Sequence, residues 1–174
     1  MEIISVNITQ NIFDEADRRN NIFQKKFGNT GTHRLNKGRQ RMTGYLAEAC
    51  IRSRFPILKY SDDPNIDFIL YDSITIDSKA QGCNSKPSEH YVATLYEEQK
   101  LRNVDYYIFS RVKNDFTIAW ICGIVSKEYF LNNAKLVTAG TVNNNFTYDQ
   151  SRYEMQYNQL NDITQFFHNK YENI

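Results

Sequence analysis

Apolar residues follow two periodicities along this chain, one typical of helices and one typical of strands. The clearest helical stripe lies between residues 39 and 55, where Met42, Leu46, Ala49 and Cys50 fall at positions i, i+4, i+7 and i+8. Pro56 ends this stretch, because the residue before a proline disfavours helical backbone angles. Looser stripes and capping residues predict further helices over residues 10–26, 87–101, 126–131 and 151–171.

Strands are predicted for an opening apolar stretch and for five later runs. They cover residues 3–8, 57–60, 66–71, 73–81, 104–112 and 116–125. The last two runs are almost continuously apolar and rich in aromatic and β-branched residues, which is typical of buried strands. Segments 66–71 and 73–81 are joined so tightly around Asp72 that they form a hairpin. This order predicts an α/β domain with a mixed central sheet flanked by helices.

The composition narrows the class of protein. A chain of 174 residues fits one domain with a core of its own. Its three cysteines are an odd number without a CxxC pair, so we expect no disulfide framework or zinc site, and a reducing cytoplasm suits them. No apolar run reaches about 18 residues, and the first residues do not resemble a signal peptide. We therefore expect a soluble intracellular protein without a membrane partner.

Positive charge is concentrated near the N-terminus, although the formal net charge is only +1. Eight cations and no Asp or Glu lie between residues 18 and 41: Arg18, Arg19, Lys25, Lys26, Arg34, Lys37, Arg39 and Arg41. Such a segment can neutralise nucleic-acid phosphates and release their counterions. We expect Arg34, Lys37, Arg39 and Arg41 to contact a DNA backbone near the start of the second helix. The alternative is a solvated basic face.

Candidate chemistry lies on the predicted hairpin. Side chains alternate along a strand, so Asp77, Lys79 and Gln81 share one face of segment 73–81, with Asp77 and Lys79 roughly 7 Å apart. Asp67 begins the neighbouring strand, and the tight turn brings it across from Asp77. Two carboxylates at that spacing suit Mg²⁺, which takes oxygen ligands and keeps several waters. The alternative is a set of charged residues that protects an exposed strand edge.

Two side chains extend this candidate site. Glu48 lies at the margin of the apolar stripe of its helix, where it could add a metal ligand directly or through water. Gln81 could contact a phosphate or a water, or it is a plain polar residue at a strand end. Other chemistries are poorly supported, because the three histidines are isolated and segment 28–34 lacks the lysine of a phosphate-binding loop.

The pattern resembles the PD-(D/E)XK nuclease superfamily. The match is Asp67, nine intervening residues, then Asp77-Ser78-Lys79, with Glu48 as the upstream helical acid. The resemblance spans about residues 38–125 and implies a restriction-endonuclease-like αβββαβ core. The motif is imperfect, because Ile66 precedes Asp67 and the proline stands at position 64. Asp62 or Asp63 therefore remains a possible substitute for Asp67.

The resemblance implies an Mg²⁺-dependent DNA endonuclease, with Mn²⁺ as a possible substitute. Asp67, Asp77 and Glu48 would bind metal, and Lys79 would position water or stabilise the transition state. We expect one nuclease domain over residues 1–174, divided into a basic segment (1–37), a catalytic core (38–125) and a C-terminal helical extension (126–174).

The expected substrate is double-stranded DNA, cut at specific sites in the manner of a homing or restriction enzyme, such as a phage-encoded one. Cutting both strands needs two active sites, which favours a homodimer or a higher homo-oligomer. A structure-specific junction resolvase of the same superfamily and a non-catalytic nucleic-acid-binding protein are the alternatives.

Overall fold

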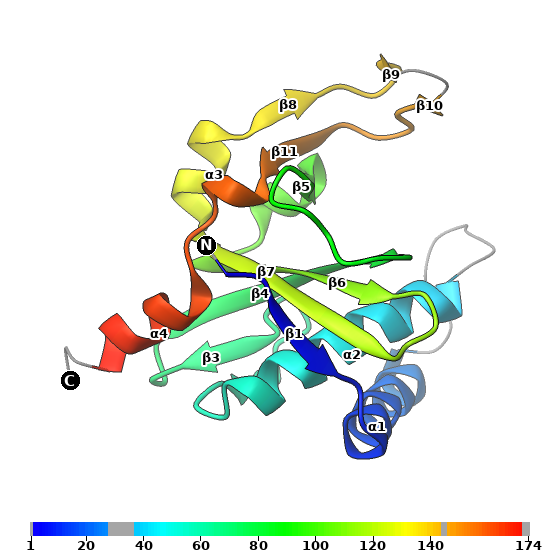
Figure 1. Cartoon of the computed structure of the whole chain (residues 1–174), viewed down its shortest axis with the longest axis vertical. Coiled ribbons are helices and arrows are strands. Elements are labelled where there is room, and N and C mark those ends of the chain that lie inside the picture. The colour runs from blue at the N-terminus through cyan, green and yellow to red at the C-terminus, as the bar shows by residue number, and fades with distance from the viewer. Residues whose placement is uncertain (1, 28–36, 144–145, 172–174) are drawn as a thin grey trace.

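A six-stranded mixed sheet forms the centre of the molecule, with strands in the order β1-β7-β6-β4-β3-β2 (Figure 1). The computed structural model describes residues 2–27, 37–143 and 146–171. The strands of this sheet are β1 (Ile4–Asn7), β2 (Lys59–Tyr60), β3 (Phe68–Leu70), β4 (Ile74–Cys83), β6 (Tyr106–Lys113) and β7 (Ile118–Ser126). β4 and β6 run parallel, and the other neighbouring strands are antiparallel.

The turn between β3 and β4 sets the register of the hairpin. Tyr71 and Asp72 both have positive φ, 53° and 59°, and the amide of Ser73 donates to the Leu70 oxygen. A two-residue turn of this kind matches the right-handed twist of the strands that it joins. It pairs Phe68 with Ile76 across the hairpin. The residue before Phe68 therefore lies beside the residue after Ile76.

Helices cover one face of this sheet. α1 (Gln10–Phe27) packs on α2 (Lys37–Arg54), which lies against β4, β6 and β7. Buried side chains of the two helices meet Val112 and Ala119 of the sheet. α4 (Ile163–Tyr171) adds Ile163 and Phe167 to a second cluster, which also holds the end of α2. The apolar stripe of α2 is therefore the contact surface between the helices and the sheet.

A smaller sheet and a short helix cover the opposite face (Figure 1). This sheet has the strand order β5-β11-β8. Its strands are β5 (Val92–Tyr96), β8 (Lys135–Val137) and β11 (Arg152–Gln156), accompanied by α3 (Lys127–Asn133), the 3₁₀ helices η1 (Glu97–Leu101) and η2 (Tyr157–Gln159), and the short pair β9 (Val142–Asn143) and β10 (Phe146–Thr147). Leu95 and Met155 pack there against Tyr107, Phe109 and Trp120 of the central sheet. The chain thus forms three layers: the helices α1, α2 and α4, the central sheet, and the smaller sheet with α3.

Most of the predicted elements are confirmed. The α/β class, the mixed central sheet and the six predicted strands are present, as are the helices at the positions of α1, α2 and α3. Ser126 caps α3, since its hydroxyl accepts from the amide of Tyr129. The cysteines are free thiols. Among the described residues, no helix is long and apolar enough to cross a membrane.

Two predicted helices are wrong. Segment 87–101 contains the strand β5 and the 3₁₀ helix η1, and segment 151–171 begins with the strand β11 before α4. β5 and β11 pair with each other, so side chains that fit a helical stripe are buried in alternation instead. The region 126–174 is therefore not a helical extension, because β8 to β11 lie within it. The expected αβββαβ order also fails after β4, where β5 and η1 replace the second helix.

Candidate carboxylate–lysine site

The β3–β4 hairpin places two aspartates together. Asp67 directly precedes β3, and its amide donates to the Ile76 oxygen at 3.0 Å. Its carboxylate Oδ2 accepts from the amide of Ser78 at 2.7 Å. Ser78 lies beyond the part of β4 that pairs with β3, which is Ile74 to Ile76. In this position the side chains of Asp67 and Asp77 share a hydrogen bond. The predicted pair of carboxylates therefore lies in one place.

Asp77 is buried between two cations. Its side chain is 1% exposed, and its Oδ2 lies 2.6 Å from Lys79 Nζ and 3.0 Å from Arg102 Nη1. Lys79 is the neighbour expected from strand alternation. Arg102 follows η1 and comes from outside the motif. A buried carboxylate needs such compensation, because an unpaired charge away from water is costly.

Glu48 reaches the same place from α2. It is 7% exposed, and its Oε2 lies 3.0 Å from Arg19 Nη1 of α1, although the two atoms are not aligned as a hydrogen bond. The Arg19 guanidinium lies 3.6 Å from the ring centroid of Tyr60 and 5.6 Å from that of Tyr45. Stacked rings and an ion pair fix this arginine, and it in turn holds Glu48 close to the aspartates.

The pKa shifts reflect burial and mutual repulsion of these groups. Burial, with the nearby Asp77 charge, raises the pKa of Asp67 to about 7. Burial also raises the pKa of Glu48 well above its usual value, and the negative charge of Asp67 adds to this effect. Burial lowers the pKa of Lys79, against the attraction of Asp77. Groups whose protonation is shifted in this way are common in active sites, although structural ion pairs also produce such shifts.

The donor chemistry of the cluster fits a hard divalent cation. Asp67 and Asp77 supply only oxygen ligands, and a cation bound by both would relieve the repulsion that, together with burial, raises the pKa of Asp67. One or two carboxylates together with substrate oxygens and waters suffice for Mg²⁺. As the described side chains are placed, no three of the Asp, Glu, His and Cys residues could jointly hold a metal ion. Glu48 is therefore not a direct third ligand in this arrangement.

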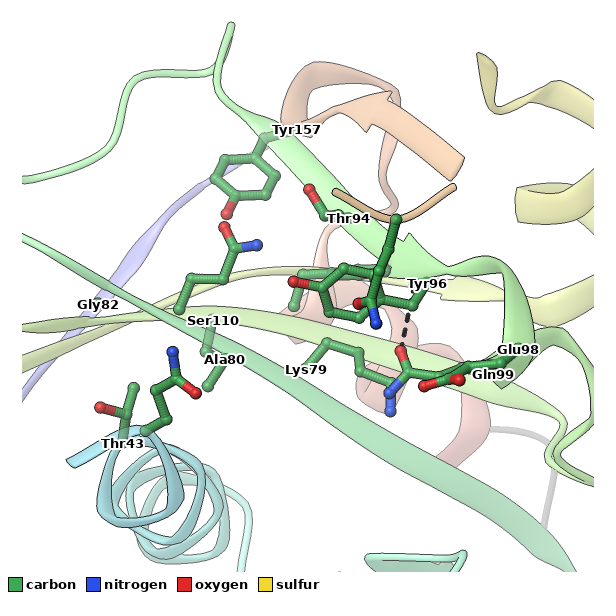
Figure 2. A pocket seen from close by; sticks show the side chains of 14 residues that line it. Thr43, Lys79, Ala80, Gly82, Thr94, Tyr96, Glu98, Gln99, Ser110 and Tyr157 are labelled. Carbon is green, nitrogen blue, oxygen red and sulfur yellow. Dashed lines mark hydrogen bonds between the residues drawn. The ribbon is translucent and has the colours of Figure 1, made fainter. Parts of the chain in front are cut away.

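Two adjoining cavities flank the cluster. The first, which we call the arginine cleft, has a volume of about 490 Å³ and is lined by Glu48 and Asp67 together with Arg18, Arg19 and Arg41, among others. The second has a volume of about 560 Å³ and is lined by Lys79 and Gln81 of β4 (Figure 2). Gln40 of α2 lines both cavities. Glu48 and Asp67 thus line the first cavity and Lys79 lines the second, so the cluster lies between the two.

The predicted DNA-contacting residues are only partly described. Arg34 lies outside the described residues, and so does the side chain of Lys37, the first residue of α2. Arg39 donates to the backbone oxygen of Asn114. Arg41 lines the arginine cleft and lies 5.7 Å from the ring centroid of Phe23. Of the two members of the predicted set whose side chains are described, Arg41 lines the cleft that Glu48 and Asp67 also line, whereas Arg39 does not.

Arg102 was not expected at the site, and Arg19 was expected only as one of the eight cations of the basic segment. Neither residue lies in a motif, and only the need of a buried acid for positive partners could have suggested them. Of the possible substitutes for Asp67, Asp63 accepts from the amide of Asn65 at 2.8 Å within its own turn. Asp67, and not Asp63, lies beside Asp77.

Comparisons of the chain with models of known protein families, with curated proteins and with solved structures found no match.

Proposed function

We propose that this chain is a metal-dependent endonuclease that hydrolyses phosphodiester bonds of DNA. One observation supports this function above the others. Glu48, Asp67, Asp77 and Lys79 come from a helix and a hairpin and converge in one cluster between two cavities, with Glu48 and Asp77 buried and Asp67 and Lys79 partly buried. Acids and a lysine together can bind a cation and a phosphate, whereas a surface that only binds DNA has no need of buried acids.

The sheet leaves this cluster accessible to a substrate. β3 pairs with residues Ile74 to Ile76 of β4, so among the described residues β4 has no strand neighbour on that side from Ser78 to Cys83. Lys79 and Gln81 lie in this unpaired part and line a cavity. A phosphodiester could approach the strand edge there and reach the side chains on both sides of it.

Each residue has a role that follows from its position. Asp67 and Asp77 would hold Mg²⁺ or Mn²⁺, with Glu48 assisting through water. Such a cation, when bound, supplies charge stabilisation and a more acidic water. The Lys79 ammonium, held 2.6 Å from Asp77, would hold the attacking water or donate to the developing phosphate charge. Gln81 lies two residues further on the same strand face and would contact a phosphate oxygen or a water.

The arginine cleft would receive the DNA backbone. Arg18, Arg19 and Arg41 line it beside Glu48 and Asp67. Cations placed next to acids reduce the repulsion between the acidic cluster and a polyanion, and they release counterions when DNA binds. We propose that Arg34, Lys37 and Arg39 also contact the DNA backbone.

The finer assignment follows the resemblance. We propose that the order α2-β2-β3-β4 corresponds to the first half of a restriction-endonuclease-like core, and the proposed catalytic residues lie on these elements or, for Asp67, directly before β3. We propose site-specific cleavage of both DNA strands by a homodimer, since one active site cuts one strand at a time.

The test is incubation of purified protein with a long, sequence-diverse duplex and with a four-way junction, in Mg²⁺, Mn²⁺ or EDTA. We expect discrete fragments that require the metal, and no cleavage by Asp77→Asn. Asp72→Asn is the matched control, because Asp72 lies on the same hairpin but is 79% exposed and pairs with Lys59. Cleavage in EDTA, or full cleavage by Asp77→Asn, would refute the proposal. Cleavage of the junction alone would assign a junction resolvase.

A second candidate function is DNA binding without catalysis. It is favoured by the ion pairs of Asp77, which satisfy this buried acid without any metal. Under this alternative the protein retards DNA equally in EDTA and in Mg²⁺ and cuts no substrate.

A further inference from the structure

The second cavity has an unusual lining, which we call the amide pocket. Four glutamines from four parts of the chain line it: Gln40 of α2, Gln81 of β4, Gln99 of η1 and Gln150 before β11. Figure 2 shows Thr43, Lys79, Tyr96 and Gln99 facing this space from α2, β4 and the β5–η1 segment. Its volume of about 560 Å³ lies within the range of small-molecule sites, roughly 300–1,000 Å³.

The polar groups of the pocket are available for a ligand. The Gln99 amide oxygen accepts from the backbone N–H of Tyr96 at 3.3 Å, which leaves its NH₂ group as the free donor. Among the described residues, the side chains of Gln40, Gln81 and Gln150 have no hydrogen-bond partner. The Ser110 hydroxyl, on a residue that is 2% exposed, also lacks one. The Ser110 oxygen has almost no accessible surface, whereas Gln40 and Gln150 are exposed and Gln81 is partly buried, so the glutamine amides are the groups that a ligand can reach.

The chemistry of the lining selects a neutral planar ligand with donors and acceptors. A side-chain amide can donate and accept hydrogen bonds at once along the edge of a planar ligand, as glutamine does with a nucleobase. Tyr96 contributes an aromatic ring, on which a base can stack. The charged residues of the described lining are Lys79 and Glu98. A neutral base would thus lie among the amides while its phosphate lies at Lys79.

We propose that the amide pocket binds one unpaired nucleobase of the DNA strand whose phosphate lies at Lys79. The position of this phosphate rests on the proposed nuclease function. A base within a duplex is stacked and paired, so it cannot enter a pocket with walls on both sides of the β4 edge, whereas an extrahelical base can. The enzyme would therefore act on DNA with an unpaired nucleotide, or extrude one next to the bond that it cuts.

The test measures DNA binding without cleavage. Fluorescence anisotropy in EDTA compares a labelled, fully paired duplex with four duplexes of the same sequence that carry one unpaired A, C, G or T. We expect at least one unpaired nucleotide to bind about tenfold more tightly than the paired duplex, as base stacking and amide contacts predict. Gln99→Leu and Gln150→Ala should reduce this preference to less than about threefold. Both variants should bind the paired duplex like the wild type.

The control variant is Gln165→Ala, because Gln165 is exposed on α4 and lines none of the cavities around the site. It should keep the full preference. Equal binding of all five duplexes by the wild type, no DNA binding at all, or a preference that survives in both pocket variants would overturn the proposal.

A parallel incubation in Mg²⁺ separates this inference from the proposed function. A preference for an unpaired base without any cleavage refutes the nuclease and supports the pocket. Cleavage without a preference supports the nuclease and refutes the pocket.

Discussion

Replacement of Asp67 by asparagine should stabilise this protein while it abolishes cleavage. Asp67 accepts from the Ser78 amide at 2.7 Å and shares a hydrogen bond with Asp77. Asparagine has the same shape, can accept the Ser78 bond with its oxygen and can donate its NH₂ group to Asp77. It therefore preserves these contacts and removes one negative charge from a place where two repel each other.

The pH dependence of the stability follows from the raised pKa of Asp67, about 7 in the folded chain against an ordinary value of 3.8. Folding favours the protonated carboxyl, so the stabilisation is complete below about pH 4 and is lost as the pH rises through about 7. A difference of roughly three in pKa corresponds to about 4 kcal/mol at pH 8. Asp67 is only half-buried at the arginine cleft, so solvent screening leaves about 1–2 kcal/mol.

Thermal and urea unfolding in EDTA at pH 8 and pH 4 measure this effect. At pH 8 we expect Asp67→Asn to unfold about 2–8 °C above the wild type, and at pH 4 the difference should vanish. Addition of Mg²⁺ at pH 8 should raise the midpoint of the wild type but not that of the variant, because ligands stabilise the form that binds them. Asp72→Asn serves as the control, since its exposed pair with Lys59 should matter little at either pH.

Two results would refute this reasoning. If Asp67→Asn destabilises the protein at pH 8, then Asp67 is held as a stable carboxylate and the aspartates do not repel. If Mg²⁺ leaves the wild-type midpoint unchanged well above millimolar concentration, then the two carboxylates do not form the metal site.

Three further predictions test other contacts. Lys79→Ala should lower the cleavage rate about hundredfold with little change in DNA affinity, and single-turnover rates against anisotropy will separate the two. Arg19→Met leaves the buried Glu48 without its cation and should lower the free energy of unfolding by about 2 kcal/mol at pH 8. Arg19→Met combined with Glu48→Gln should recover most of that loss in urea unfolding. A double variant whose effect is the simple sum of the two single effects would contradict the ion pair. Ser126→Ala removes the hydroxyl that accepts from the Tyr129 amide and should cost about 1 kcal/mol of stability. Ser126→Asp should retain most of that stability, because aspartate also caps helices. Equal losses of stability in both variants would exclude capping.

The candidate site could be anticipated because its main relations are local. Alternation along a strand places Asp77 and Lys79 on one face, and a tight turn brings Asp67 across from them. Glu48 could be suggested from its position on a helix, but its distance from the aspartates depends on how α2 packs on β4. Chain geometry over a few residues thus predicted the hairpin with its two aspartates and Lys79. The packing of α2 on β4 decided whether Glu48 joins them.

The two wrong helices show where local patterns are insufficient. Segments 92–96 and 152–156 are short and partly apolar, so both helical and strand patterns fit them. They become strands by pairing with each other, Val92 opposite Gln156 and Tyr96 opposite Arg152. That pairing joins residues more than fifty positions apart, and no window of sequence contains both partners.

The sequence by itself determined the α/β order, the hairpin and the acid–lysine pair, because helix and strand periodicity and tight turns act over a few neighbouring residues. Only the tertiary structure decided that Arg102 and Arg19 compensate the buried acids and that four separated glutamines line one pocket. Charge compensation and cavity shape are properties of side chains that meet in space, and burial sets their strength. These contacts depend on the packing of whole layers, which no local pattern specifies.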